Sequence, residues 1–202
     1  MVSQQLRGRG IRDERVLEAM SRVPRELFVP QDDRAAAYSD RPLPIGDKQT
    51  ISQPYIVARM CELAEVGERD TVLDVGCGSG YQTAVLAMLA ERVIGIEIQR
   101  SLAQRAERAL AAAGVHNAEI RCADGGYGAP DAAPFAAILI AAAARRAPVP
   151  LVDQLADGGR LVMPLGGRWA QELVRFIRRS DALIKDSHGG VRFVAFVGDY
   201  GR

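Results

Sequence analysis

Residues 72–81, which read Val-Leu-Asp-Val-Gly-Cys-Gly-Ser-Gly-Tyr, constrain the fold more than any other part of this chain. The β-branched run at their start predicts a strand that ends at Val75, and the Ala- and Leu-rich residues that follow predict a helix. Between the two, glycine stands at every second position, at Gly76, Gly78 and Gly80. Glycine lets a backbone turn sharply and approach a ligand where a Cβ atom would collide. Both a ligand-binding loop of an α/β sheet and a plain strand-to-helix turn fit this pattern.

Strand-like and helix-like runs alternate from residue 71 onward. The apolar, β-branched runs cover residues 71–75, 93–98, 119–122, 135–140 and 160–163. The helix-like runs between them cover residues 81–90 and 101–113. This rhythm predicts an α/β protein with a Rossmann-like, doubly wound, mostly parallel sheet and helices on both faces.

The two ends of the chain follow other patterns. Apolar residues at helical spacing predict a helix over 13–28, broken near Pro24, and a second helix over 55–64. The stretch 30–54 between them has little periodicity, which is typical of a functional or disordered loop. At the other end, the β-rich runs 172–178 and 191–197 are expected to pair across a turn region, 180–190, as an antiparallel edge hairpin.

Composition narrows the class of protein. The length of 202 residues and 48% hydrophobic content predict a single globular domain over 1–202. A net charge of +1 gives no reason to expect a nucleic-acid or membrane partner. Three cysteines without CxxC spacing predict neither a disulfide framework nor a metal site. Because the N-terminus also lacks the apolar core of a signal peptide, we expect a cytoplasmic protein.

An acidic residue after the glycine loop indicates a nucleoside ligand. Glu97 ends the next strand, where a carboxylate can accept hydrogen bonds from ribose hydroxyls. An NAD-binding G-x-G-x-x-G/A pattern would need glycine or alanine where Tyr81 stands, and no Lys-Ser/Thr follows as in a P-loop. Residues 74–80, Asp-x-Gly-x-Gly-x-Gly, instead resemble motif I of S-adenosylmethionine-dependent methyltransferases. In that family Asp124 and Gly125, after the third strand, would border the adenine.

Several further blocks resemble protein-L-isoaspartate O-methyltransferases. They stand in the family's order, and the resemblance extends from about residue 23 to 197. The blocks are residues 38–46, 49–58, 78–84, 154–162 and 191–194. The resemblance implies methylation of the free carboxylate of L-isoaspartyl residues in damaged proteins and peptides, which starts their repair through a succinimide.

The resemblance also implies a set of site residues. Ser52 falls on the family's active-site serine and would orient the carboxylate, with Thr50 beside it. The cofactor S-adenosylmethionine, and its product S-adenosylhomocysteine, would be held by Asp74, Gly76, Gly78, Gly80, Glu97, Asp124 and Gly125. The resemblance also divides the single domain into two parts. Residues 1–55 would form an N-terminal helix and acceptor segment, and residues 56–202 would form the cofactor-binding sheet and hairpin.

The chemistry of a carboxylate acceptor agrees with this assignment. A carboxyl group with a reference pKa of about 4 is already ionised at neutral pH, so its methylation needs no general base. The two histidines, His116 and His188, fall in predicted loops. Without the resemblance, a serine or threonine before a helix is more often an N-cap. The expected partners are isoaspartyl proteins and peptides, and the enzyme is expected to be a monomer.

One loop departs from the family pattern. Ala141 and Ala144 stand where the family usually has a threonine and a proline, close to the active site. Two alternatives therefore stay open beside repair. One is a methyltransferase adapted to a dedicated peptide or small carboxylate, and the other is a cofactor-binding protein that has lost repair activity.

Overall fold

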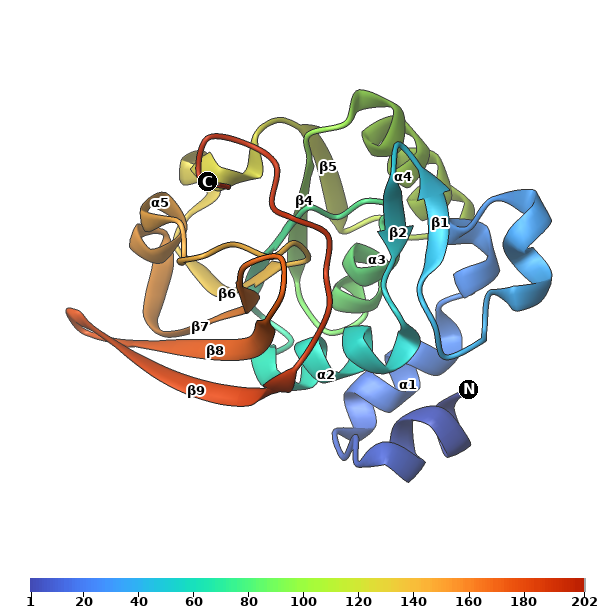
Figure 1. Cartoon of the computed structure of the whole chain (residues 1–202), viewed down its shortest axis with the longest axis horizontal. Coiled ribbons are helices and arrows are strands. Elements are labelled where there is room, and N and C mark those ends of the chain that lie inside the picture. The colour runs from blue at the N-terminus through green and yellow to red at the C-terminus, as the bar shows by residue number, and fades with distance from the viewer. Residues whose placement is uncertain (202) are drawn as a thin grey trace.

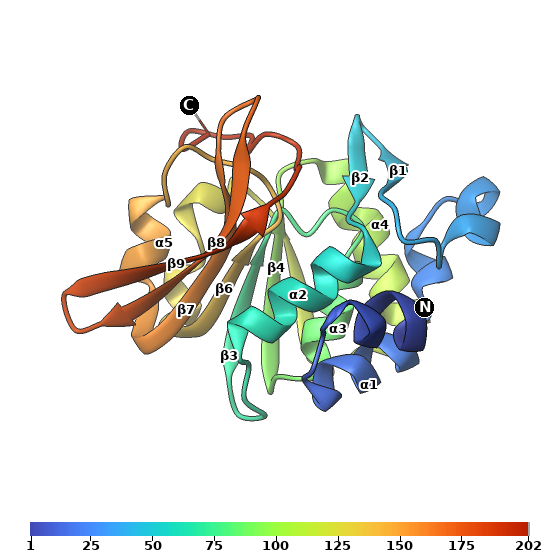
Figure 2. The same cartoon turned by 60° about the horizontal axis from the view of Figure 1, so that its bottom comes forward.

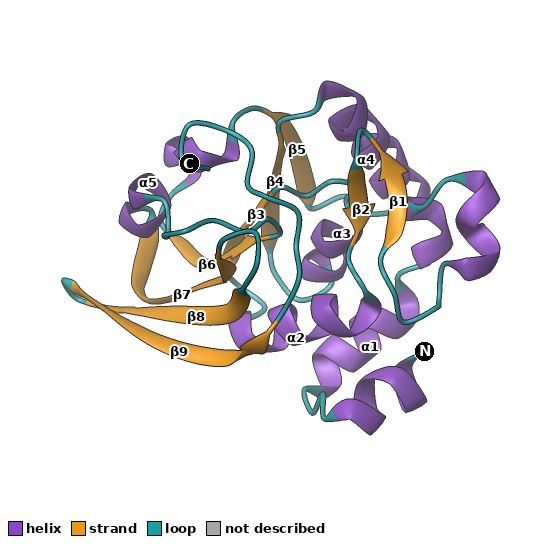
Figure 3. Cartoon of the chain, viewed as in Figure 1, coloured by secondary structure: helices purple, strands orange, loops and turns teal. Residues whose placement is uncertain are grey.

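A seven-stranded sheet forms the centre of the computed structural model, which describes residues 1–201 (Figures 1 and 3). The strand order is β5-β4-β3-β6-β7-β8-β9, in which the first five positions are parallel and the last two strands are antiparallel. The parallel strands are β3 (Thr71–Val75), β4 (Arg92–Glu97), β5 (Ala118–Cys122), β6 (Phe135–Ile140) and β7 (Leu155–Gly166). The predicted α/β class and mostly parallel sheet are confirmed.

The chain order reverses at the centre of this sheet. β3 pairs with β4 on one side and with β6 on the other, so that Val72 lies opposite both Val93 and Ala137. At such a reversal, the loops after two neighbouring strands leave in opposite directions and open a crevice for ligands. The loop that follows β3 is the glycine-rich segment. The topology therefore places that segment at the crevice.

Alternating side chains of the strands build a core on each face of the sheet. On one face Val72 and Val93 pack with helices α1–α4, and on the other Leu73 and Ile94 pack with α5 and short 3-10 turns (Figure 2). The helices are α1 (Glu14–Arg22), α2 (Pro54–Ala64), α3 (Tyr81–Ala87), α4 (Arg100–Ala112) and α5 (Val149–Asp153). The short helical turns are η1 (Val2–Leu6), η2 (Arg7–Arg9), η3 (Arg25–Phe28), η4 (Gln31–Ala36), η5 (Gly125–Tyr127) and η6 (Pro130–Ala132).

The stretch 30–54 is more ordered than the sequence predicts. After η4 it forms a β-hairpin of β1 (Leu43–Gly46) and β2 (Gln49–Ile51). Asp47 and Lys48 make its two-residue turn with φ of 49° and 59°, as in a type I′ turn, which matches the twist of a hairpin. The buried side chains alternate over so few residues, and among so many prolines, that the sequence carries no clear strand signal.

The second strand of the C-terminal hairpin also differs from the prediction. β8 (Gln171–Arg179) pairs with β9 (Ala182–Gly190), and residues 191–197 form no strand. The turn at Ser180 and Asp181 is tight, with a φ of 54° at Ser180. It therefore folds residues 182–190 back at once, although they include polar residues and two glycines. His188, predicted in a loop, lies on β9.

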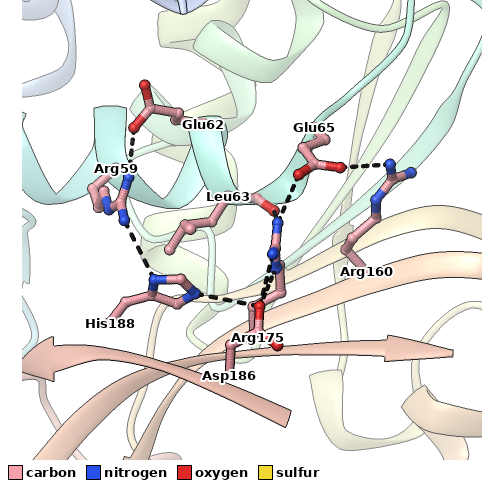
Figure 4. Close-up of polar contacts among 8 residues, drawn as sticks. All are labelled: Arg59, Glu62, Leu63, Glu65, Arg160, Arg175, Asp186 and His188. Atoms are coloured by element: carbon pink, nitrogen blue, oxygen red, sulfur yellow. Dashed lines mark hydrogen bonds and ion pairs between the residues drawn. The ribbon is translucent and has the colours of Figure 1, made fainter. Parts of the chain in front are cut away.

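Polar contacts connect this unexpected strand to β8 and, directly or through β8, to α2 and the residue after it (Figure 4). Arg175 on β8 donates to Asp186 on β9 at 2.7 Å and to Glu65, just after α2, at 2.7 Å. Arg59 on α2 contacts Nδ1 of His188 at 3.3 Å. The polar residues that weaken the strand signal are thus the ones that attach β9 to the rest of the fold.

The residues beyond β9 cross the carboxyl ends of the parallel strands. Ala195 forms an isolated parallel bridge with Ala143, in the loop after β6. The N–H of Phe196 donates to the carbonyl of Ala143 at 2.8 Å. The apolar residues of the run 191–197 do not extend the sheet: Val191 and Phe193 pack against the core, and residues 194–197 lie over the crevice. Within residues 1–201, no helix is both long and apolar enough to cross a membrane.

Replacing Leu161 with alanine tests the core on the face of the sheet that α5 covers. Leu161 on β7 is fully buried, and large-to-small changes of this kind cost about 2–5 kcal/mol of unfolding free energy. Leu183→Ala on β9, where the side chain is 38% exposed, is the matched control and should cost under about 1 kcal/mol. Urea unfolding followed by circular dichroism measures both. Equal losses in the two variants would contradict the assigned core.

Candidate active site

The glycine loop after β3 is fixed to the end of β4 by its backbone. The N–H groups of Gly76 and Cys77 donate to the carbonyl oxygen of Ile96 at 2.8 and 3.1 Å. Gly76, Gly78 and Gly80 have φ of 72°, 55° and 84°, values that side chains with a Cβ atom rarely adopt. The alternate glycines are thus a requirement of the loop's path.

Glu97 completes the loop from the neighbouring strand. One carboxylate oxygen accepts from the N–H of Gly78 at 2.9 Å, and the other accepts from the N–H of Gln99 at 2.8 Å. These two bonds hold the carboxylate in one orientation at the end of β4. Each oxygen has a further lone pair, so Glu97 can still accept hydrogen bonds from the two hydroxyls of a ribose.

Asp74 lies beneath the loop and supports it. Its side chain is fully buried and accepts from Nε2 of Gln82 at 2.8 Å and from Oγ1 of Thr83 at 2.6 Å. Both donors belong to the first turn of α3, so Asp74 ties β3 to that helix. Burial raises the pKa of Asp74 to about 6, against the effect of these two hydrogen bonds.

The acceptor segment predicted from the sequence reaches the same crevice from β2. Thr50 on that strand is exposed, and Ser52 is half-buried just before α2. The residue at the N-cap of α2 is Gln53, and its side chain makes no capping bond. Ser52 is therefore not an N-cap. Within residues 1–201, the hydroxyls of Thr50 and Ser52 have no hydrogen-bond partner in the structure.

A single pocket brings most of the predicted site residues together. Glycine-loop, acceptor-segment, β4 and C-terminal residues all contribute to its wall. The lining residues are Gln49, Thr50, Ile51, Ser52, Val57, Val75, Gly76, Cys77, Gly78, Ser79, Tyr81, Gln82, Ile96, Glu97, Ile98, Gly125, Ala141, Ala142, Val194, Ala195, Phe196 and Val197.

Three predicted residues lie outside the pocket lining. Asp74 is buried beneath the loop, and Gly80 packs its backbone against Ala106 of α4. Asp124 uses both carboxylate oxygens within the protein, since they accept from the N–H groups of Gly126 and Asp199 at 2.8 and 2.9 Å. Asp124 therefore joins the loop after β5 to the C-terminal segment, whereas its neighbour Gly125 faces the pocket.

The sequence pattern does not predict the contribution of residues 194–197. These residues are remote from every cofactor motif. The signals they carry are an apolar character that exceeds the needs of an exposed end and, at Val194, membership of the family-like block 191–194, neither of which indicates a pocket wall. Ala141 and Ala142 also line the pocket, through a loop whose shape is set by its backbone. The N–H of Ala141 donates to Val75 at 2.9 Å, and that of Ala143 donates to Val194 at 2.8 Å. Neither bond needs the threonine usual in the family.

The pocket lining carries a single negative charge, which suits a positively charged nucleoside. Glu97 is the one carboxylate among the lining residues, and no histidine is among them. Burial raises the pKa of the Cys77 thiol well above its ordinary value, so this lining residue stays protonated and unreactive. Residues 1–201 hold no cluster of His, Cys, Asp and Glu that could bind a metal ion. The pocket can orient reactants, but it offers no evident general base.

Comparison with known sequences identifies the family. The family profile described as protein-L-isoaspartate(D-aspartate) O-methyltransferase matches residues 1–201. A protein-L-isoaspartate O-methyltransferase of Syntrophobacter fumaroxidans is 55% identical over 201 residues, covering 100% of this chain and 94% of the relative. One of Syntrophus aciditrophicus is 52% identical, with the same coverage of both chains. This chain belongs to the protein-L-isoaspartate O-methyltransferase family.

Solved structures agree with this family membership. A protein-L-isoaspartate O-methyltransferase superposes with a TM-score of 0.90 at 26% identity, covering 100% of this chain and 67% of that one. A second, from Plasmodium falciparum and in complex with S-adenosyl-L-homocysteine, gives a TM-score of 0.83 at 26% identity and covers 97% and 96%. The chain is accordingly an S-adenosylmethionine-dependent protein carboxyl methyltransferase that acts in the repair of isoaspartyl sites.

The buried carboxyl group of Asp74 predicts a pH dependence of stability. Its pKa is about 6 in the folded protein and 3.8 when unperturbed, so the folded state binds the proton more tightly. Stability relative to an Asp74→Asn variant should therefore fall as pH rises from about 4 to about 6, by on the order of 3 kcal/mol, and then level off. Urea unfolding of both proteins at pH 4.5, 5.5 and 7 measures this difference. A constant difference would show that the bonds from Gln82 and Thr83 balance burial, and one that rises with pH would show that they outweigh it.

Proposed function

We propose that this pocket aligns an L-isoaspartyl carboxylate, held by Ser52 and Thr50, with S-adenosylmethionine, held by Gly76, Gly78 and Glu97. The observation that carries this proposal is that the acceptor segment and the glycine loop line one pocket, although separate elements supply them. Bound there, S-adenosylmethionine supplies an activated methyl group on a sulfonium. The chain's own residues provide position, and not acid or base chemistry.

The acceptor side of the proposal rests on free hydroxyl groups. Ser52 and Thr50 lie on the pocket wall, and neither hydroxyl is used to cap α2. A hydroxyl donates one hydrogen bond, so two of them can hold both oxygens of a carboxylate. Such positioning lowers the entropic part of a barrier without a covalent intermediate. Ser52 is accordingly assigned an orienting role and not that of a nucleophile.

The cofactor side rests on Glu97 and the backbone of the loop. Glu97 is only 5% exposed, and its carboxylate is oriented by two backbone N–H groups. Gly125 supports this wall because a Cβ atom there would lie 2.5 Å from Cγ1 of Val75. Asp74, Gly80 and Asp124 are proposed to act indirectly, by holding the loops that face the cofactor.

The roles of the C-terminal segment and of the two parts of the chain, and the expected partners, follow from the same proposed site. Residues 194–197 lie across the crevice and would exclude water from bound reactants. We place residues 1–55 on the acceptor side and 56–202 on the cofactor side of one domain. Isoaspartyl proteins and peptides are the proposed partners of a monomeric, cytoplasmic enzyme.

Ser52→Ala tests the acceptor role together with the reaction itself. Transfer of labelled methyl groups from S-adenosylmethionine is measured for an isoaspartyl peptide and for its normal aspartyl twin. The wild type should label only the isoaspartyl peptide, and the variant should lose at least about tenfold in kcat/KM because one bond to a charged group is removed. Affinity for S-adenosylhomocysteine should stay within twofold of wild type.

The control for this experiment is Ser21→Ala, which removes an exposed hydroxyl of α1 that donates to the carbonyl of Glu18. It should retain the wild-type rate. A Ser52→Ala enzyme at full rate would contradict the role of Ser52. Labelling of neither peptide by a wild type that binds the cofactor would contradict the proposed acceptor.

Glu97→Ala tests the cofactor role. Hydrogen bonds to charged groups contribute about 1.5–3 kcal/mol, so affinity for S-adenosylhomocysteine should fall roughly ten- to a hundredfold. Isothermal titration calorimetry measures the change. Glu119→Ala on β5, which removes an exposed carboxylate paired with Arg92 and Arg121, should leave affinity unchanged. Equal affinities of Glu97→Ala and wild type would show that this carboxylate does not contact the ligand.

A further inference from the structure

Arg25, on the short turn η3, is a fully buried cation behind the acceptor segment. Its side chain is 0% exposed. Nε donates to the carbonyl of Ala37 at 2.7 Å, and Nη2 donates to the carbonyl of Ser52 at 2.8 Å. The guanidinium also lies over the ring of Tyr81, with its carbon 4.6 Å from the ring centre. Arg25 thus contacts the backbone of one pocket residue and the side chain of another.

This buried charge has no carboxylate partner among residues 1–201. It donates to two backbone carbonyls, and Nη1 is buried without any partner; the side chain that most favours its charge is the neutral Tyr81. Asp40 acts on Arg25 only from a distance, because that carboxylate pairs with Arg9 and accepts from Gln53 and Tyr55. Burial lowers the pKa of Arg25, but a guanidinium stays protonated at neutral pH.

Burying a cation without a counter-charge is costly. Donating to two backbone carbonyls requires N–H groups but no net charge, so these hydrogen bonds alone do not account for a buried guanidinium at this position. The carboxylate of an acceptor bound to the Ser52 hydroxyl would supply the missing negative charge. Only the backbone of Ser52, whose carbonyl accepts from Arg25, would lie between that carboxylate and the guanidinium. In this buried setting the attraction would be screened much less than at the surface.

We propose that Arg25 is a positioning residue that fixes the backbone of Ser52 and makes the acceptor site selective for an anion. The inference rests on the proposed acceptor role of Ser52 and deepens it. Arg25 supplies the attraction for the carboxylate's charge, whereas the hydroxyls of Ser52 and Thr50 supply its orientation. The site would then discriminate a carboxylate from a neutral group of the same shape, such as a carboxamide.

The test pairs a change in the enzyme with a change in the ligand. Two peptides are titrated into the enzyme saturated with S-adenosylhomocysteine, the isoaspartyl peptide and the same peptide with its free α-carboxylate replaced by a carboxamide. The ratio of their Kd values measures selectivity for the negative charge. A purely structural defect weakens both peptides alike and leaves the ratio unchanged.

Three variants separate charge from hydrogen bonding. Arg25→Gln keeps a donor for the Ser52 carbonyl but removes the charge, and Arg25→Lys keeps the charge. Arg15→Gln is the matched control, since Arg15 also donates to two backbone carbonyls, those of Val66 and Leu89, away from the pocket. The wild type and Arg15→Gln should prefer the carboxylate at least tenfold. Arg25→Gln should reduce that preference to threefold or less, and Arg25→Lys should keep most of it.

Several results would overturn the inference. If the wild type binds the two peptides with Kd values within twofold of each other, the inference is wrong, whether or not any variant folds. An unchanged preference in Arg25→Gln, or a preference lost in Arg25→Lys as fully as in Arg25→Gln, would show that the charge of Arg25 is not what selects the anion. By contrast, a wild type that binds neither peptide would overturn the proposed acceptor site itself, and so distinguishes the two failures.

Discussion

The two hydrogen bonds from Gly76 and Cys77 to the carbonyl of Ile96 are the contacts on which the rest of the site depends. They join the loop after β3 to the end of β4, where Glu97 stands next. Because Glu97 then accepts from Gly78, the loop and the carboxylate hold each other in place. Parallel strands bring their carboxyl ends to one edge, so this pair lies beside the loop after β6 at the point where the chain order reverses. The proposed cofactor site is thus a consequence of sheet topology.

The acceptor side is assembled differently, from segments that do not belong to the parallel strands. The β1–β2 hairpin presents Thr50 and leads to Ser52, and Arg25 holds the backbone of Ser52 from behind. From the other end of the chain, residues 194–197 close the crevice through backbone bonds to Ala143. Those bonds also explain why the unusual Ala141–Ala144 composition is compatible with the family's fold. Tertiary contacts, and not a local motif, decide where Ser52 and Thr50, the proposed acceptor residues, lie in the fold.

The cofactor half could be predicted from sequence because its signals are local. Alternate glycines after a strand, and an acid at the end of the next, follow directly from what a tight ligand-binding turn requires of the backbone. The C-terminal hairpin could not be assigned in the same way. Residues 182–190 form β9 because a tight turn folds them back onto β8, and because Arg175 on β8 and Arg59 on α2 satisfy Asp186 and His188. The more strand-like segment that follows instead places residues 194–197 over the pocket. Arg25 likewise carries no sequence signal of a role at the site, because its burial and its bond to Ser52 arise only in the folded protein.

In the proposed arrangement, one pocket holds the cofactor against Glu97 and the isoaspartyl carboxylate against Ser52. A crystal structure of the enzyme with S-adenosylhomocysteine and an isoaspartyl peptide would show both contacts at once. We expect ribose hydroxyls within hydrogen-bond distance of Glu97, and the free carboxylate of the peptide within hydrogen-bond distance of the Ser52 and Thr50 hydroxyls. A peptide carboxylate that lies away from both hydroxyls, or a ribose that makes no contact with Glu97, would contradict it.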